Sequence, residues 1–167
     1  MNVRSLGIVA AALACAALAL AAPHEVRSAP ASTAADVALG RKLVAFGGCN
    51  DCHTPGWTQS DGKVPVAGWM TGSTVGFRGP WGTIYPANVR LEFRNVDETE
   101  WLHMVATRGG RLPMPWHNLR TLDVHSQRAI YRFIRSLGPA GKPAQNDVPS
   151  DTEPRGSYFN VIPVKGR

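Results

Sequence analysis

The sequence predicts a mainly helical domain with three main helices and a loop-rich middle. Three stretches, at about residues 36–46, 97–109 and 121–138, carry apolar residues at helical spacing and are bounded by capping residues or glycines. Between the first two, residues 54–96 are rich in Gly, Pro and Trp and show little helical periodicity. A segment of this kind is uncommon in a compact domain. We therefore expect it to pack against something other than its own secondary structure.

Residues 1–22 have the features of a secretory signal peptide. Arg4 supplies a positive charge, and an apolar run extends from Leu6 to Ala22. Within this run, Ala19-Leu20-Ala21 has the small-x-small pattern of a signal-peptidase site. The protein is therefore expected to be exported to the periplasm.

The sequence leaves the point of cleavage open. Cleavage at Ala22 or as late as Ala31 is possible, and an uncleaved membrane anchor is an alternative because the apolar run approaches spanning length. Cleavage would discard Cys15 and leave two cysteines in the mature chain. Residues 23–35 are expected to form a flexible linker before the first helix.

The first helix, from about Asp36 to Phe46, leads through two glycines into the run Cys49-Asn50-Asp51-Cys52-His53. Two thiols at this spacing can add across the two vinyl groups of a porphyrin, and the next residue is then placed to bind the iron. The alternatives are a chance match and a thioredoxin-like redox pair. Because haem is attached to such motifs outside the cytoplasm, the export signal supports the haem interpretation. We predict one covalently bound haem c, attached through Cys49 and Cys52, with His53 as an axial ligand.

The second and third helices have clear start and stop signals. Asp97 followed by Glu100 is a capping-box pattern, and Gly109-Gly110 ends the second helix. The third helix is expected to begin near Thr121, with Asp123 in its first turn, and to end at Gly138-Pro139. Its buried face is expected to comprise Ile130, Phe133, Ile134 and Leu137. Its opposite side carries Arg128, Arg132 and Arg135, which predict a solvated basic face or a surface that attracts an acidic partner.

A haem iron held by one imidazole has either a second protein ligand or an open position. The candidates for a second ligand are Met70, Met104, Met114, His103, His117 and His125. Met114 lies in Leu112-Pro113-Met114-Pro115-Trp116, where the two prolines restrict the backbone and hold the thioether in a non-helical loop. We predict Met114 as the second axial ligand, with Met104 and His117 as the main alternatives.

Taken together, several motifs resemble those of monohaem bacterial cytochromes c of class I type. The similarity covers about residues 36–140 and rests on Gly40, Cys49–His53, Gly79–Asn88, Pro113–Trp116 and Ile130–Leu137. It implies an all-α, cytochrome c-like fold of about three main helices around one haem. It also implies that the first and last helices pack together at Gly40, and that His53 and Met114 are the axial ligands.

The segment from Trp81 to Asn88 resembles one found in cytochrome domains associated with periplasmic or membrane-bound dehydrogenases. The resemblance implies that Trp81, Tyr85 and Asn88 contact the haem edge or its propionates. An aromatic loop used only for packing is the alternative.

Two filled axial positions leave no site for a substrate, so the expected function is one-electron transfer rather than catalysis. The resemblance implies a non-enzymatic carrier that passes electrons from a dehydrogenase to a cytochrome or oxidase, either alone or as a subunit of an oxidoreductase complex. One alternative is a haem enzyme or gas sensor with an open or displaceable sixth ligand. Another is a non-haem thiol or metal-binding module. A nucleic-acid partner is not expected for an exported haem protein, despite the net charge of +6.

Residues 141–167 are expected to form an extended C-terminal tail, because they are rich in turn-forming residues and have no helical period. The sequence leaves open whether the tail is disordered or docked. Its candidate anchors, on this domain or on another subunit, are Tyr158, Phe159, Val161 and Ile162.

Overall fold

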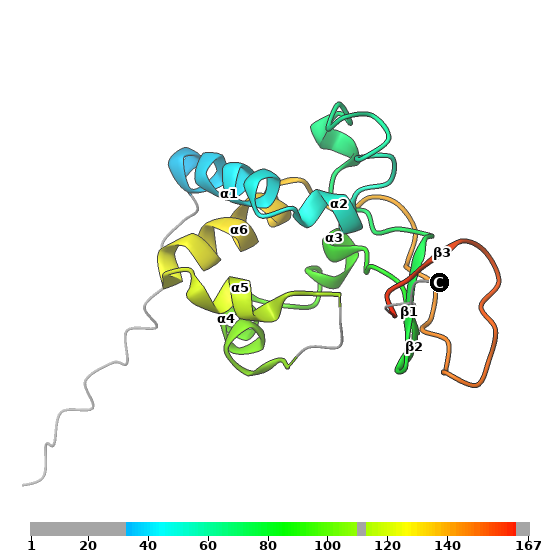
Figure 1. Cartoon of the computed structure of the whole chain (residues 1–167). Coiled ribbons are helices and arrows are strands. Elements are labelled where there is room, and N and C mark those ends of the chain that lie inside the picture. The colour runs from blue at the N-terminus through cyan, green and yellow to red at the C-terminus, as the bar shows by residue number, and fades with distance from the viewer. Residues whose placement is uncertain (1–32, 110–112, 163–167) are drawn as a thin grey trace, which may run out of the picture. The chain divides into compact units, whose positions relative to one another are not determined.

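Two long helices, α1 (Ala34–Phe46) and α6 (Val124–Ser136), pack against each other in the computed structural model (Figure 1). The structure describes residues 33–109 and 113–162. The predicted signal peptide, its cleavage sites and Cys15 lie outside these residues. The other elements, in chain order, are α2 (Cys49–His53), the 3₁₀ turn η1 (Val66–Gly68), β1 (Gly76–Gly79), β2 (Gly82–Ile84), α3 (Val89–Glu92), α4 (Glu98–Thr107), α5 (Trp116–Thr121) and β3 (Tyr158–Asn160).

The helix α1 begins at a capping box formed by Thr33 and Asp36. The Thr33 hydroxyl accepts a hydrogen bond from the Asp36 backbone N–H, and the Asp36 carboxylate accepts one from the Thr33 backbone N–H, both at 3.1 Å. These two bonds satisfy donors that a helix start otherwise leaves unpaired. The helix therefore begins at Ala34, slightly before the expected start, and takes in the last two residues of the expected linker.

The contact between α1 and α6 depends on Gly40. A Cβ atom at this position would lie 1.9 Å from the carbonyl oxygen of Ala129 and 2.7 Å from the Cβ of Phe133. Only a residue without a side chain allows the two backbones to approach this closely. The expected pairing of the first and last helices at Gly40 is confirmed.

The remaining helices follow the predicted caps only in part, and α4 ends at Thr107, before the expected stop at Gly109-Gly110. Asp97 caps α4 and accepts a hydrogen bond of 2.8 Å from the Glu100 backbone N–H, as expected. Asp123 is the N-cap of α6 rather than a residue of its first turn. Thr121 belongs to α5, a separate short helix that the sequence pattern did not reveal, because a six-residue helix contains too few turns to show a period.

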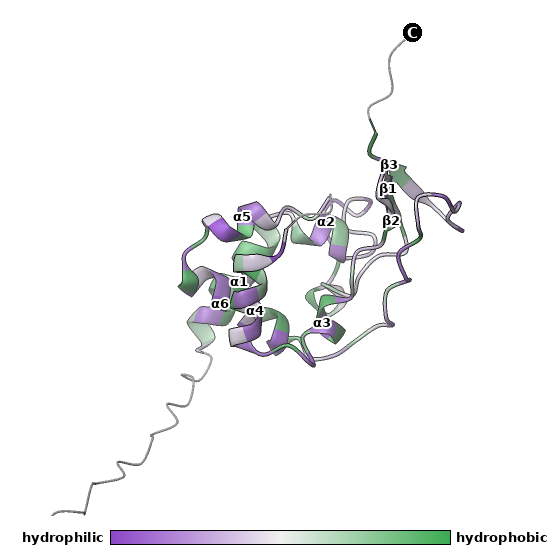
Figure 2. Cartoon of the chain, turned by 90° about the horizontal axis from the view of Figure 1, so that it is seen from below, coloured by the Kyte–Doolittle hydropathy of each residue, from purple (hydrophilic) through white to green (hydrophobic). Residues whose placement is uncertain are grey.

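An aromatic core lies between α4, α6 and the middle segment. The ring of Phe93 lies 5.2 Å from that of Trp101 and 5.1 Å from that of Tyr131. Trp69 joins the same core through an edge contact with Phe133 at 6.0 Å. The helix α6 carries hydrophobic and hydrophilic residues on different sides (Figure 2). Its predicted buried face is confirmed for Ile130, Phe133 and Ile134, while Leu137 is half-buried.

The fold is not purely helical, so the expected all-α class is wrong in this respect. A small sheet has the strand order β2-β1-β3, with β1 antiparallel to β2 and parallel to β3. Phe77 in β1 is paired with Ile84 in β2 and with Phe159 in β3. The strands have only three or four residues each, and the third comes from the tail, so no local pattern indicated them.

The C-terminal tail is docked on its own chain as far as residue 162. Thr83 exchanges two backbone hydrogen bonds with Val148, at 2.7 and 2.9 Å. Arg78 in β1 donates to the carbonyl of Thr152 at 3.0 Å and forms an ion pair with Glu153 at 3.2 Å. Of the expected anchors, Tyr158 and Phe159 form β3, but Phe159 and Ile162 keep 58% and 45% of their surface exposed.

The solvated basic face expected on α6 is wrong for Arg132, which is buried, whereas Arg135 is exposed and Arg128 is half-buried. Arg132 is buried and donates to Asp36 of α1 at 2.7 Å and to Glu98 of α4 at 2.8 Å. Arg128 pairs with the same glutamate at 3.2 Å, and Arg135 donates to the carbonyl of Phe93. These contacts tie α6 to α1, to α4 and to the residue after α3.

The capping box predicts a specific loss of stability in acid. The hydrogen bond from the Thr33 backbone is the main cause that lowers the pKa of Asp36 below its ordinary 3.8, and Arg132 acts in the same direction. The folded state therefore binds fewer protons than the unfolded state at this carboxyl, and the resulting stability is present above pH 3.8 and lost as the pH falls through the folded pKa. Urea unfolding from about pH 5 to about pH 2 should show a weaker acid dependence for Asp36→Asn than for the natural protein. The exposed Asp61→Asn variant is the control, and an equal reduction in both variants would refute this role of Asp36.

Candidate haem site

The chain turns sharply between α1 and the Cys-x-x-Cys-His run. The backbone N–H of Gly47 ends α1 by donating to the carbonyl of Leu43 at 2.8 Å. Gly48 then has a φ of 69°, a left-handed conformation that favours glycine. This turn starts α2, a single helical turn in which Cys49 and Cys52 are three residues apart and therefore lie on the same face.

Both cysteines are free and half-buried. Burial raises the pKa of Cys49 to about 11 and also raises that of Cys52. Both groups are therefore neutral thiols at physiological pH. A disulfide oxidoreductase needs an activated thiolate with a lowered pKa, so this environment argues against the thioredoxin-like alternative.

His53 is oriented by a hydrogen bond to the backbone. Its Nδ1 lies 2.8 Å from the carbonyl oxygen of Ala87, just before α3. A carbonyl can only accept, so Nδ1 carries the proton and Nε2 keeps its lone pair, as a metal-ligating imidazole requires. Burial lowers the pKa of His53, which also favours the neutral ring. The Nε2 atom has no hydrogen bond to another described residue.

A buried polar chain supports the end of α2. The Thr54 hydroxyl donates to the Asn50 side-chain oxygen at 2.7 Å and accepts from the Met70 backbone N–H at 2.9 Å. The backbone N–H of Gly72 also donates to the carbonyl of His53, at 2.9 Å. These bonds fix the loop after η1 against the Cys-x-x-Cys-His run. Asn50 and Thr54 were not predicted as site residues, and their only sequence signal is a polar residue within and directly after the motif.

The candidate second ligands differ in how much of each residue is exposed to solvent. His103, His117 and His125 are exposed, and Met70 is 3% exposed within the hydrophobic core. The two half-buried candidates are Met104, on α4, and Met114, just before α5. The structure thus places Cys49, Cys52 and His53 on one turn and Met114 on a separate segment.

The three residues of the β2 region have different surroundings. Asn88 is 2% exposed, donates to the carbonyls of Ala140 and Lys142 at 2.8 and 3.0 Å, and caps α3. Its amide N–H groups thus hold the start of the tail. Tyr85 is buried, and its backbone N–H donates to the Asp147 carboxylate at 3.2 Å. Trp81 differs from both, because its indole N–H is buried and has no hydrogen-bond partner among the described residues.

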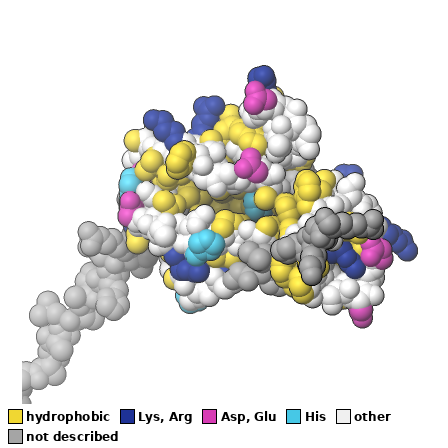
Figure 3. Space-filling view, viewed as in Figure 1, with side chains coloured by type: hydrophobic (Ala, Val, Ile, Leu, Met, Phe, Trp, Pro, Cys, Tyr) yellow, Lys and Arg dark blue, Asp and Glu magenta, His cyan; other side chains and the backbone are white. Residues whose placement is uncertain are grey.

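The donor set of α2 is suited to a group held by two thioether bonds and one imidazole nitrogen. Both thiols are free, the imidazole presents Nε2, and hydrophobic side chains gather around a hollowed part of the face in Figure 3. These features fit a covalently held haem.

Within residues 33–109 and 113–162, no three side chains of His, Cys, Asp or Glu are grouped so that they could hold a metal ion. A haem iron needs no such group, because the porphyrin supplies four of its ligands.

In the same ranges, no helix is long and apolar enough to cross a membrane. Comparisons of the chain with protein-family models, with curated proteins and with solved structures found no match.

Proposed function

We propose that this protein is a periplasmic c-type cytochrome of the monohaem class I type that carries single electrons. Cys49 and Cys52 would hold the haem covalently, and His53 and Met114 would be its axial ligands. One observation carries the proposal. Nδ1 of His53 lies 2.8 Å from the carbonyl oxygen of Ala87, and His53 shares the single helical turn α2 with two free thiols. The bound haem would supply an iron centre that exchanges one electron.

The residues of α2 other than Asp51 each have a defined task in this proposal. Thioether bonds from Cys49 and Cys52 would hold the group beside the helix, and the imidazole of His53 would bind the iron through Nε2. The Ala87 carbonyl holds the ring orientation and increases the basicity of Nε2. The Asn50–Thr54 hydrogen bond and the Met70 backbone contact keep α2 in place beside the aromatic core.

Met114 would determine whether the site transfers electrons or performs chemistry. With a thioether on the second axial position, no coordination site remains for a substrate or dioxygen, and the neutral sulfur ligand favours a high potential. The proposed donor is a dehydrogenase and the proposed acceptor is a cytochrome or an oxidase. Export rests on the sequence of residues 1–22.

Replacing Met114 with Ala is expected to lower the midpoint potential, on the order of 100 mV, and to open the iron to added ligands. Spectroelectrochemical titration of the purified haem protein measures both the potential and the one-electron slope. Met104→Ala is the matched control, because Met104 is the other half-buried candidate. An unchanged potential in the Met114 variant, or the same loss in the Met104 variant instead, would show that Met114 is not the ligand.

A further inference from the structure

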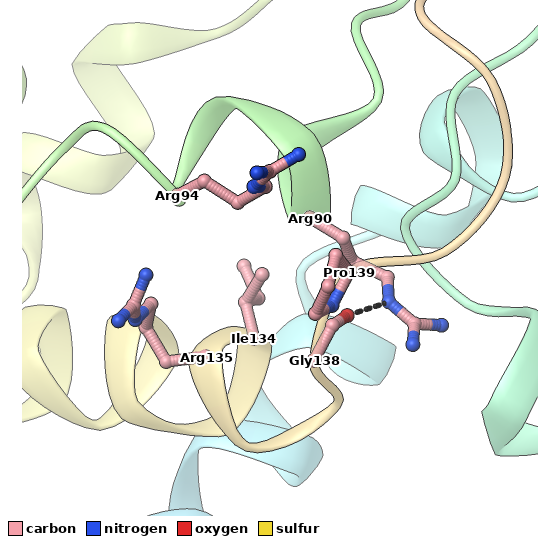
Figure 4. Close-up of a pocket in the computed structure, with 6 residues that line it drawn as sticks. All are labelled: Arg90, Arg94, Ile134, Arg135, Gly138 and Pro139. Carbon is pink, nitrogen blue, oxygen red and sulfur yellow. Dashed lines mark hydrogen bonds between the residues drawn. The ribbon is translucent and has the colours of Figure 1, made fainter.

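A cavity of about 330 Å³ lies between α3 and the C-terminal end of α6. Its wall is formed by Arg90, Arg94, Ile134, Arg135, Gly138 and Pro139 (Figure 4). Three of these six residues are arginines and none is acidic. The cavity is at the small end of the range for ligand sites.

Arg90 is a rigid part of this wall. Its side chain is buried and donates at 2.6 Å to the carbonyls of both Gly138 and Ala67, and also to that of Leu137. These acceptors pair with three of its five N–H groups but carry no formal charge, and desolvation lowers the pKa of Arg90. The positive charge is therefore fixed in place without an acidic partner among the residues it contacts.

Arg94 and Arg135 use few or none of their N–H groups in hydrogen bonds to other described residues. Arg94 follows α3, is exposed and makes no side-chain hydrogen bond or ion pair with another described residue. Arg135, on α6, is also exposed and donates one N–H to the carbonyl of Phe93, which leaves most of its five donors available. Figure 4 shows the two side chains bordering the space beside Ile134.

We propose that this cavity binds a small oxyanion, a carboxylate or a phosphate, through the N–H groups of Arg94 and Arg135 that the protein leaves available. Planar guanidinium groups bind two oxygens of such an anion at once. Ile134 and Pro139 provide an apolar wall against which the carbon chain of an organic acid can pack. The inference concerns a site separate from α2 and does not rest on the haem proposal.

The test is isothermal titration of the purified full-length protein with succinate and, separately, with inorganic phosphate at constant ionic strength. One saturable site is expected, with a Kd of about 1 mM. Arg94→Gln should weaken binding about tenfold, because it removes a charge-assisted interaction and leaves a shorter, uncharged polar side chain. Arg155→Gln, which alters an exposed arginine outside the cavity, should not change the Kd.

Comparing the two anions identifies the source of the ligand. Tighter binding of succinate indicates an organic carboxylate, and tighter binding of phosphate indicates a phosphate group. Non-saturable heats for both anions, or equal weakening by Arg94→Gln and Arg155→Gln, would overturn the proposal. Arg90 is left unchanged because its three carbonyl contacts make a folding defect the expected result of its substitution. Failure of a haem test would not affect any of these outcomes.

Discussion

Replacing both Cys49 and Cys52 with Ser is expected to abolish covalent haem attachment. A serine hydroxyl does not form the thioether bond, and the chain has no other cysteine outside the predicted signal peptide. Any haem retained through His53 alone would be released by acid–acetone extraction. The expected result is a coloured natural protein, whose intact mass includes one haem, and a variant from which all the pigment is extracted.

The Asp51→Asn variant is the matched control for this experiment. Asp51 lies between the two cysteines and is exposed, so its substitution keeps both thiols and the imidazole in place. This control should retain the pigment after extraction. If the natural protein instead has the mass of the unmodified chain after export by a host that attaches haem, Cys49 and Cys52 do not carry a haem.

Gly40→Ala is expected to be among the most destabilising single substitutions in the domain. The added Cβ would lie 1.9 Å from the Ala129 carbonyl oxygen, so α1 and α6 would have to separate. Overpacking of this kind costs about 3 kcal/mol or more, and the higher helix propensity of alanine offsets only about 1 kcal/mol. Urea unfolding should therefore show a free energy of unfolding lower by about 2 kcal/mol or more.

Gly109→Ala provides the comparison for this prediction. A Cβ atom at Gly109 would meet no atom of the described residues within 4 Å, so this substitution should change the unfolding free energy by less than about 0.5 kcal/mol. Equal stability of the two variants would mean that the close approach of α1 and α6 is not maintained in solution.

Features that depend on nearby residues were predictable from the sequence. The capping residue Asp97 and the buried face of α6 follow from spacing and side-chain chemistry over a few residues. The contact at Gly40 was expected from the family resemblance and is confirmed. The cap and the buried face were predictable because each is encoded within one element.

Features that depend on distant residues were not predictable. The sheet forms because the tail returns to β1 and β2, and Arg132 is buried because acidic residues of α1 and α4 meet it. At the candidate site, the motif indicated Cys49, Cys52 and His53, but nothing in it indicated that Ala87, 34 residues away, would orient the imidazole. The sequence likewise did not indicate that Asn50, Thr54 and Asn88 hold loops in place, because their hydrogen bonds depend on segments that come together only in the folded chain.

The absorption spectrum of the ferrous protein before and after addition of carbon monoxide tests the proposed electron carrier most directly. If His53 and Met114 both bind the iron, no position is open, and carbon monoxide should leave the spectrum unchanged. A prompt shift of the haem bands would contradict the carrier proposal and indicate an accessible iron, as in a haem enzyme or a gas sensor.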